Sequence, residues 1–258
     1  DNGGVTSNTD LDNALGAFSD TDIHYTVVGG TLIANGVSDE LLVPVGHTYA
    51  PGGDVSASNI KVLGTLIGGS STFTVAGDWN SSSGTWSANT SSVVLNGTGT
   101  LNSAGSSFYD LTTGAASQVT TLTSNLTVDN VLTIAHATGT LTDAGGGHDI
   151  KVTGTGTPFV NNGSTVIANN FIYSNPNSVT ITVAGGIYNV AESLWFDSQN
   201  SGAGTTFELN ADLQVTGSGV IRAYSSTTGL SILDTTISSR NITASNLQIG
   251  NSLFQAEK

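Results

Sequence analysis

From about residue 60 onward the chain is a succession of very short apolar runs, and this cadence limits the fold more than any other feature. Clear examples occupy residues 73–76, 92–95, 119–122, 131–134 and 150–153. Apolar and polar positions alternate within the runs, and β-branched and aromatic residues predominate, as is typical of strands. The runs begin roughly 6–12 residues apart. Strands this short cannot form a broad open sheet.

Short sequence motifs recur along the chain, with Gly and Asn between them. Gly-Thr-Leu occurs at 30–32, 64–66, 99–101 and 139–141. The spacing between the repeated motifs is irregular, but the residue types in the strand-like runs stay the same. This combination predicts a solenoid, because corner loops can vary in length whereas the inward-facing positions cannot.

An ordered series of longer motifs carries a family resemblance. The motifs are Asp-Trp-Asn (78–80), Gly-Thr-Trp-Ser-Ala (84–88), Ser-Val-Val-Leu-Asn-Gly-Thr-Gly (92–99), Phe-Tyr-Asp-Leu (108–111), Leu-Thr-Ser-Asn-Leu-Thr-Val (122–128) and Val-Leu-Thr-Ile (131–134). Over about residues 64–170 the series resembles the degenerate β-solenoid, or parallel β-helix, repeat proteins of bacterial and archaeal cell surfaces. The resemblance implies an all-β parallel β-helix at the cell surface. Tandem β-sandwiches are the alternative fold, since short alternating strands suit both.

Composition excludes several classes of protein. The 258 residues include 5 Lys+Arg and 19 Asp+Glu, a net charge of -14, which cannot supply the basic surface that nucleic acid requires. The abundance of Gly, Ser, Thr and Asn disfavours an all-helical fold. No stretch approaches the roughly 18 apolar residues of a membrane helix, so no membrane insertion is expected. There is no Cys, so packing and backbone ladders must stabilise the fold without disulfides.

Charge divides the chain into two expected regions. The first cation is Lys61, and every charged side chain before it is acidic: Asp1, Asp10, Asp12, Asp20, Asp22, Asp39, Glu40 and Asp54. We therefore expect an acidic N-terminal region, 1–58, and a β-solenoid repeat domain, 59–258. The N-terminal region can be interpreted as a cap over one end of the solenoid, or as a segment exchanged with a neighbouring subunit.

The acidic region also holds the only candidate metal ligands. Asp10 and Asp12, and again Asp20 and Asp22, are carboxylate pairs at i, i+2, which in a loop can converge on one hard cation such as calcium. Solvated surface acids are the alternative. The histidines His24, His47, His136 and His148 are scattered without the spacing of a zinc site. Apart from a possible calcium ion, no cofactor is expected.

Two further site hypotheses concern carbohydrate. Enzymes of this fold that cleave acidic polysaccharides need clustered Asp with Arg or Lys, and the candidates are Arg222 and Arg240 with Asp197, Asp212 and Asp234. A sugar-stacking surface would draw on aromatic side chains, and the candidates for it are Trp79, Trp86, Tyr109 and Trp195. Core packing is the alternative for most of these rings.

The sequence therefore favours an extracellular, non-enzymatic structural protein with no catalytic residues. We expect a self-assembling β-solenoid subunit of a filament, surface layer or adhesin stalk, with copies of itself as partners. An adhesin module that binds glycans or another cell surface is the alternative. A polysaccharide-cleaving enzyme is the second alternative.

Overall fold

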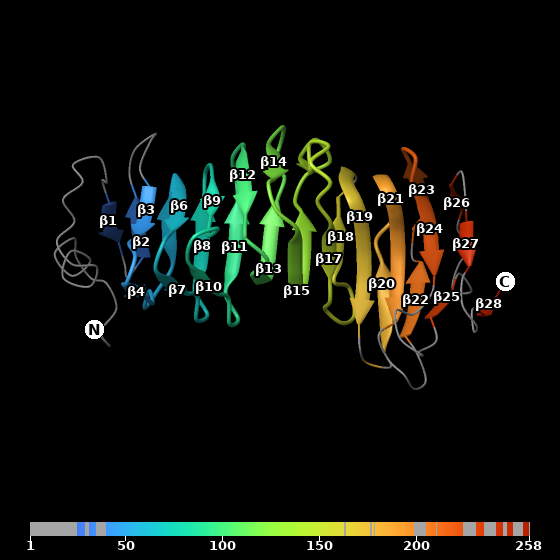
Figure 1. The fold of residues 1–258 in the computed structure, drawn as a ribbon, viewed down its shortest axis with the longest axis horizontal. Helices are drawn as coiled ribbons and strands as arrows, with labels where there is room; N and C mark the ends of the chain where they lie inside the picture. The colour runs from blue at the N-terminus through green and yellow to red at the C-terminus, as the bar shows by residue number, and fades with distance from the viewer. Residues whose placement is uncertain are drawn as a thin grey trace.

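The fold is an elongated all-β rod, seen here in a computed structural model (Figure 1). The strands run across the long axis, and β1 (Tyr25–Val28) and β28 (Gln255–Glu257) lie at opposite ends. The structure describes residues 25–28, 31–34, 40–162, 164–175, 177, 179–198, 205–209, 211–223, 231–234, 241–244, 247–249 and 255–257. This part of the chain contains no helix, and so none that could cross a membrane.

The chain coils as a parallel β-solenoid with three strand positions in each turn, which define faces A, B and C. Face A contains β2 (Thr31–Ala34), β5 (Val55–Ala57), β8 (Thr72–Val75), β11 (Ser92–Leu95), the second parts of β13 (Ser107–Thr113) and β15 (Leu126–Ile134), and β18 (Phe159–Asn161). It continues through β20 (Thr180–Val183), β22 (Thr205–Leu209), β25 (Ser231–Asp234) and β28. An isolated parallel bridge between Gly156 and Ile181 links the two series.

Faces B and C complete each turn. Face B contains β3 (Glu40–Val43), β6 (Asn59–Val62), β9 (Trp79–Asn80), β12 (Gly99–Asn102), β14 (Val119–Leu122), β16 (Thr140–Thr142), the first parts of β19 (Thr165–Asn175) and β21 (Gly186–Ser198), β23 (Leu213–Thr216) and β26 (Ile242–Thr243). Face C starts with β4 (Thr48–Tyr49), β7 (Thr65–Ile67) and β10 (Thr85–Ser87). It continues with the first parts of β13 and β15, then β17 (Ile150–Val152), the second parts of β19 and β21, β24 (Val220–Ala223) and β27 (Leu247–Ile249).

These pairings confirm the predicted parallel β-solenoid, but four strands are longer than the sequence suggested. The longest, β21, has 13 residues. β13, β15, β19 and β21 each run through a corner of the coil, and a register shift in the ladders between β13 and β15 and between β19 and β21 marks the bend. The extra residue lets one strand serve two faces. β15 and β19 were each expected as two short strands, and β13 and β21 each as a single short strand.

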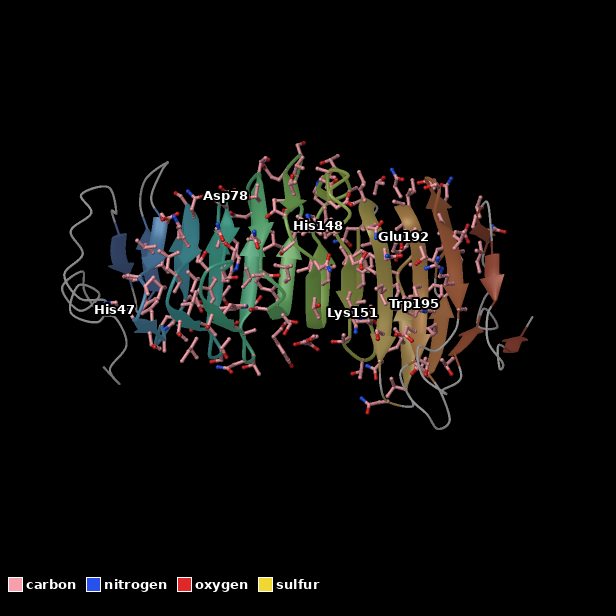
Figure 2. All side chains as sticks on the ribbon, in the orientation of Figure 1. His47, Asp78, His148, Lys151, Glu192 and Trp195 are labelled. Atoms are coloured by element: carbon pink, nitrogen blue, oxygen red, sulfur yellow. The ribbon has the colours of Figure 1, made fainter. Side chains whose placement is uncertain are left out.

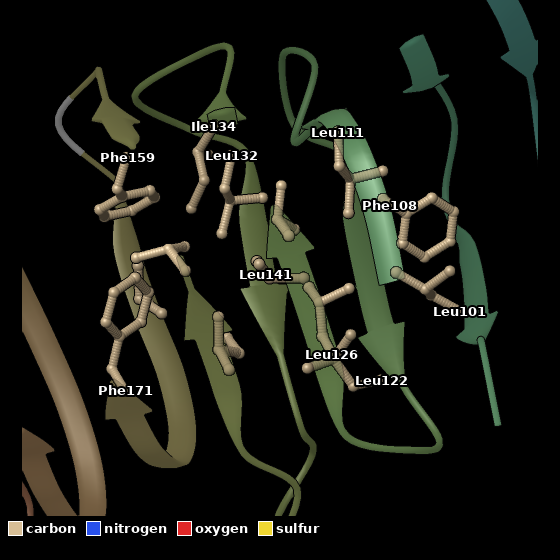
Figure 3. Close-up of a cluster of buried hydrophobic side chains, with 14 of the residues drawn as sticks. Leu101, Phe108, Leu111, Leu122, Leu126, Leu132, Ile134, Leu141, Phe159 and Phe171 are labelled. Atoms are coloured by element: carbon tan, nitrogen blue, oxygen red, sulfur yellow. The ribbon is translucent and has the colours of Figure 1, made fainter. Parts of the chain in front are cut away.

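Alternation along each strand divides its side chains between outside and inside (Figure 2). β8 and β11, for example, both bury every second side chain. The inward side chains from all three faces form one continuous hydrophobic core along the rod. Leu and Ile dominate its middle, with rings from Phe108 on one side and Phe159 and Phe171 on the other (Figure 3). Thr, Ser and Asn are common at outward positions, as the composition predicts, although some of them, such as Ser81 and Thr120, are buried.

Turn length varies along the rod. On face A, Val55 pairs with Phe73, whereas on face B Leu213 pairs with Ile242, a partner much further along the chain. The difference lies in the corner loops. At one tight corner Gly114 has φ +67°, and a Cβ on Gly139 of the next turn would overlap the Gly114 carbonyl. Only glycine permits the two backbones to approach so closely.

The parallel ladder also includes strands that precede residue 59. β3, β4 and β5 pair in parallel with β6, β7 and β8, so residues 40–57 already belong to the coil. Further towards the N-terminus, β1 pairs with β2 antiparallel, the one antiparallel pairing among the described strands. The role of residues 1–58 as a cap or exchanged segment stays a prediction.

Candidate functional site

The most distinctive surface feature is a row of four unlike side chains on face C. Lys151 of β17 pairs in register with Ile172 of β19, Ile172 with Trp195 of β21, and Trp195 with Arg222 of β24. We call these four residues the Trp195 row. Adjacent rungs are about 4.8 Å apart, so the backbone positions of Lys151 and Arg222 lie about 14 Å apart with Ile and Trp between them.

The alternation of inward and outward side chains along each strand places the Trp195 row on the outside of the rod. The row residues are all partly exposed, whereas their neighbours along each strand are buried. Leu194 and Phe196, on either side of Trp195, are 0% and 1% exposed. Figure 2 shows Lys151 and Trp195 on the same face of the rod. Because each strand is fixed by its core neighbours and by two parallel partners, the row is a rigid, preformed surface.

A ladder of polar residues stacks at the corner where face B meets face C. Its members occupy equivalent positions in successive turns, each directly before an inward apolar residue of face C: Asn125, Asp149, Asn170 and Ser193. Asn125 Oδ1 accepts from the Asp149 N–H at 3.0 Å, Asn170 Nδ2 donates to Asp149 Oδ1 at 2.9 Å, and Ser193 Oγ donates to Asn170 Oδ1. Cross-rung bonds of this kind stabilise the corner.

Two carboxylates meet in this corner beside the Trp195 row. The Asn170 amide also donates to Glu192 Oε2 at 3.2 Å, so it bridges Glu192 and Asp149. Asp149 Oδ1 accepts two more bonds, from Asn169 Nδ2 and the Asn170 N–H, both at 3.1 Å. Asp149 is thus committed to holding the corner, which is a structural role. Asp149 lies two residues before Lys151, and Glu192 lies three residues before Trp195, so both carboxylates belong to turns that carry the row.

A closed hydrogen-bond ring lies in the core between faces B and C. Tyr188 Oη donates to the Ala184 carbonyl at 2.7 Å, so the 2.8 Å contact with Tyr173 has Tyr173 as donor. The Ala184 N–H donates back to Tyr173 Oη at 3.2 Å. Burial raises the pKa of Tyr173. Burial, with repulsion from a charged Tyr173 as a further cause, raises the pKa of Tyr188 well above its usual value. Both phenols stay neutral, which favours a packing role.

A groove of about 520 Å³ lies near the C-terminal end of face B. It is lined by residues that open β21, β23 and β26 or precede them: Gly186, Ile187, Asp212, Leu213, Gln214, Asn241, Ile242 and Thr243. Asp212 accepts from the Asn241 N–H at 3.0 Å and from Asn241 Nδ2 at 3.3 Å, which joins the last two rungs. The exposed side chains Ile187 and Ile242 make the groove partly apolar.

The candidate calcium ligands Asp10, Asp12, Asp20 and Asp22 lie outside the described residues, so this site stays a prediction. Among the residues that the structure describes, no three His, Cys, Asp or Glu side chains are grouped to hold a metal ion. His47 and His136 are exposed on loops, and His136 Nδ1 lies 3.0 Å from Thr138 Oγ1. His148 lies in a corner loop directly after Gly147, which has φ +74°.

The structure distributes over different parts of the coil the aspartates that were grouped around Arg222, and of them Asp197 shares face C with Arg222. Asp197 belongs to face C, Asp212 to the corner before β23, and Asp234 to face A, while Arg240 lies outside the described residues. Of the candidate sugar-stacking rings, Trp79 and Trp86 are buried, 0% and 5% exposed. Tyr109 and Trp195 are partly exposed.

Sequence reasoning considered Trp195 and Arg222 for two separate sites, and it did not consider Lys151 or Ile172. The contact depends on the lengths of the three turns that separate Lys151, Ile172, Trp195 and Arg222, and each of these turns is longer than the one before it. Because the turns are unequal, the row residues have no fixed spacing in the sequence. The row is evident only from the register of the paired strands.

A scan against protein-family models, a search of curated protein sequences and a search of solved structures each find no match to this chain. The parallel β-solenoid is therefore established by the strand pairings of this chain, and its function has to be argued from its own surfaces.

Proposed function

We propose that the chain is a non-enzymatic structural element, a rigid β-solenoid rod that self-associates end to end in an extracellular filament, surface layer or adhesin stalk. The observation that carries the proposal is the last rung of face B. Ile242 pairs in register with Leu213, an inward residue that is 2% exposed, yet Ile242 itself is 38% exposed. An inward position is therefore exposed on the last described rung of face B.

The backbone at this end has the same property. In the pairings of the described residues, β26, β27 and β28 each have a partner strand on one side. A parallel edge with an apolar inward row is a template for another rung of the same kind. At the opposite end β3 and β4 also have one described partner strand each. Rungs of a second copy could thus continue both the ladder and the core.

The surface composition supports the same role. Most outward positions carry Thr, Ser and Asn rather than charges, and only 9% of the chain is charged. Few long charged side chains have to be ordered or desolvated when two rods meet. The composition and the motif series also resemble those of prokaryotic cell-surface proteins, which supports an extracellular location.

The test removes one hydrogen-bond donor from the open edge. The Leu213 N–H donates to the Asn241 carbonyl at 3.0 Å, so Asn241 points towards β23. Because successive residues of a strand point to opposite edges, the Ile242 N–H points away from β23. Ile242→Pro removes that donor, Ile242→Lys places a charge at the joint, and Ile242→Val is the matched control that keeps both the donor and a β-branched apolar side chain.

We expect electron microscopy and sedimentation to show end-to-end polymers of the unmodified chain and of Ile242→Val. Ile242→Pro and Ile242→Lys should give short, separate rods with an unchanged far-ultraviolet circular dichroism spectrum. Separate rods of the unmodified chain at every protein concentration would refute self-association. Equal polymerisation of all four proteins would show that the face B end is not the joint.

A further inference from the structure

The Trp195 row combines an apolar centre with a polar perimeter. Ile172 and Trp195 are adjacent in the row, with Lys151 and Arg222 beyond them along the rod axis. On one side the exposed Glu192 stands at the corner, where it accepts from the buried Asn170 amide. The apolar face of a pyranose ring packs well on an indole, and its equatorial hydroxyls then need donors and acceptors around the edge. The row supplies the apolar surface for stacking, and the row and its corner supply hydrogen-bonding groups at the edge.

Most other aromatic side chains are placed differently. Trp79 and Trp86, the other tryptophans, are at most 5% exposed, and the largest fully buried side chains include six Phe residues. The fold thus has inward positions that accept tryptophan. Trp195 instead occupies an outward position between two core residues, so its partial exposure follows from register. An indole held partly open on a rigid sheet is a preorganised stacking surface.

Charge decides which class of glycan suits the row. Acidic side chains accompany Lys151 and Arg222: Asp149 and Glu192 lie in the adjoining corner, and Asp197 lies on face C two residues after Trp195. The whole chain carries a net charge of -14, which repels polyanions. Surroundings of mixed charge favour hydrogen bonds to hydroxyls over ion pairs with carboxylates. The Arg222 guanidinium has five N–H donors, so it can serve a neighbouring group and a sugar hydroxyl together.

From this geometry we infer that the Trp195 row is a binding platform for an uncharged linear polysaccharide, with one pyranose ring stacked on Trp195 and its hydroxyls bonded to the flanking polar side chains. This site goes beyond the role of a structural rod: it would attach the side of the rod to a neutral glycan, while the ends remain engaged in assembly.

The experiment is affinity electrophoresis through gels that contain hydroxyethyl cellulose, galactomannan or dextran as neutral probes, and alginate as an anionic probe. Intrinsic fluorescence provides a second readout, since Trp195 is the only partly exposed tryptophan of the three. The variants are Trp195→Ala and Trp195→Phe, which keeps a ring for stacking. Tyr109→Ala is the matched control, because Tyr109 is another partly exposed aromatic residue, on β13 away from the row.

We expect at least one neutral probe to retard the full chain and to shift its tryptophan fluorescence. Trp195→Ala should weaken that binding about tenfold or more, the range expected for loss of a central aromatic contact. Trp195→Phe should retain part of the binding, and Tyr109→Ala all of it. Urea unfolding of each variant checks that the rod is intact.

Three outcomes would overturn the inference. The first is that no neutral probe is bound, or that Trp195→Ala binds as well as the unmodified chain. The second is a preference for alginate over every neutral probe, which would contradict the charge argument. The third is a change in sedimentation of Trp195→Ala without any glycan binding, which would make the row a contact between copies of the chain. Loss of end-to-end assembly in the Ile242 variants affects none of these readouts.

Discussion

Two aromatic clusters fill different parts of the same solenoid core, and they differ in how their polar atoms are satisfied. Towards the N-terminal end, Phe73, Trp79, Trp86 and Phe108 pack edge to face, with the two indole centroids 4.9 Å apart. Towards the C-terminal end, the rings of Phe159, Phe171, Tyr173, Tyr188, Phe196 and Phe207 form a longer series. Both clusters exclude water from the rod.

The polar atoms of the two clusters have different partners. In the C-terminal cluster both hydroxyls belong to the closed ring through Ala184. Near the N-terminal cluster, Tyr49 Oη and Trp86 Nε1 are buried without a hydrogen-bond partner in the part of the chain that the structure describes. Trp79 Nε1 donates to Ser81 Oγ at 3.3 Å, and the rest of the stability there must come mainly from apolar contact. The C-terminal cluster adds directional bonds that fix the relative placement of two turns.

The largest expected effect is at the centre of the N-terminal cluster. Trp79 contacts Phe73, Trp86 and Phe108, so Trp79→Ala should lower the free energy of unfolding by about 3–5 kcal/mol. Urea unfolding followed by circular dichroism measures the change. Trp79→Phe, which keeps a ring, should cost clearly less. If the two variants were equally stable, ring contact would not hold this cluster together.

Much of this architecture could be predicted from the sequence, and the reason is physical. Alternation within runs such as 92–95 predicts strands with one inward face, and Gly at corners such as Gly114 predicts tight turns. Strand pairs between distant residues could not be predicted, because turn length changes along the rod. Tyr173 and Tyr188 meet because β19 runs from face B round to face C, so that an inward residue of face C faces an inward residue of face B in the next turn.

Replacing one tyrosine by phenylalanine in or near each cluster tests the difference in hydrogen bonding. Tyr188→Phe leaves the Ala184 carbonyl and the Tyr173 hydroxyl without their partner in a buried site, which should cost about 1–3 kcal/mol. Tyr49→Phe removes a buried hydroxyl that has no described partner, so it should be neutral or stabilising.

Paired urea titrations of the two variants measure both effects. Tyr173→Phe is a further control within the ring, and it should also destabilise, because Tyr173 Oη accepts from the Ala184 N–H. Equal losses at Tyr49 and Tyr188 would contradict the contrast between the clusters.

High pH should weaken the rod through the same tyrosines. Burial raises the pKa of Tyr49, Tyr173 and Tyr188 in the folded state, while the unfolded state ionises near pH 10. Their contribution is therefore fully present below pH 10. As the pH rises above 10 towards the folded pKa, the unfolded state releases its protons first, and each tyrosine costs about 1.4 kcal/mol per pH unit.

The free energy of unfolding, measured between pH 8 and pH 11, should fall with a shallower slope in Tyr188→Phe than in the unmodified chain. Tyr49→Phe should flatten the slope by a similar amount, even though it has the opposite effect on stability at neutral pH. Identical slopes in all three proteins would show that these phenols ionise equally easily in the folded and unfolded states.

The smallest expected effect is at Trp195, which is an outward residue. Its indole is partly exposed and is not part of the hydrophobic core. Trp195→Ala should therefore cost about 1 kcal/mol or less, against several for Trp79→Ala, although both substitutions remove the same side chain from a strand. Urea unfolding of the two variants side by side measures the difference. A loss at Trp195 as large as that at Trp79 would mean that the indole supports the rod itself, and the partial exposure of the row would then no longer favour a ligand.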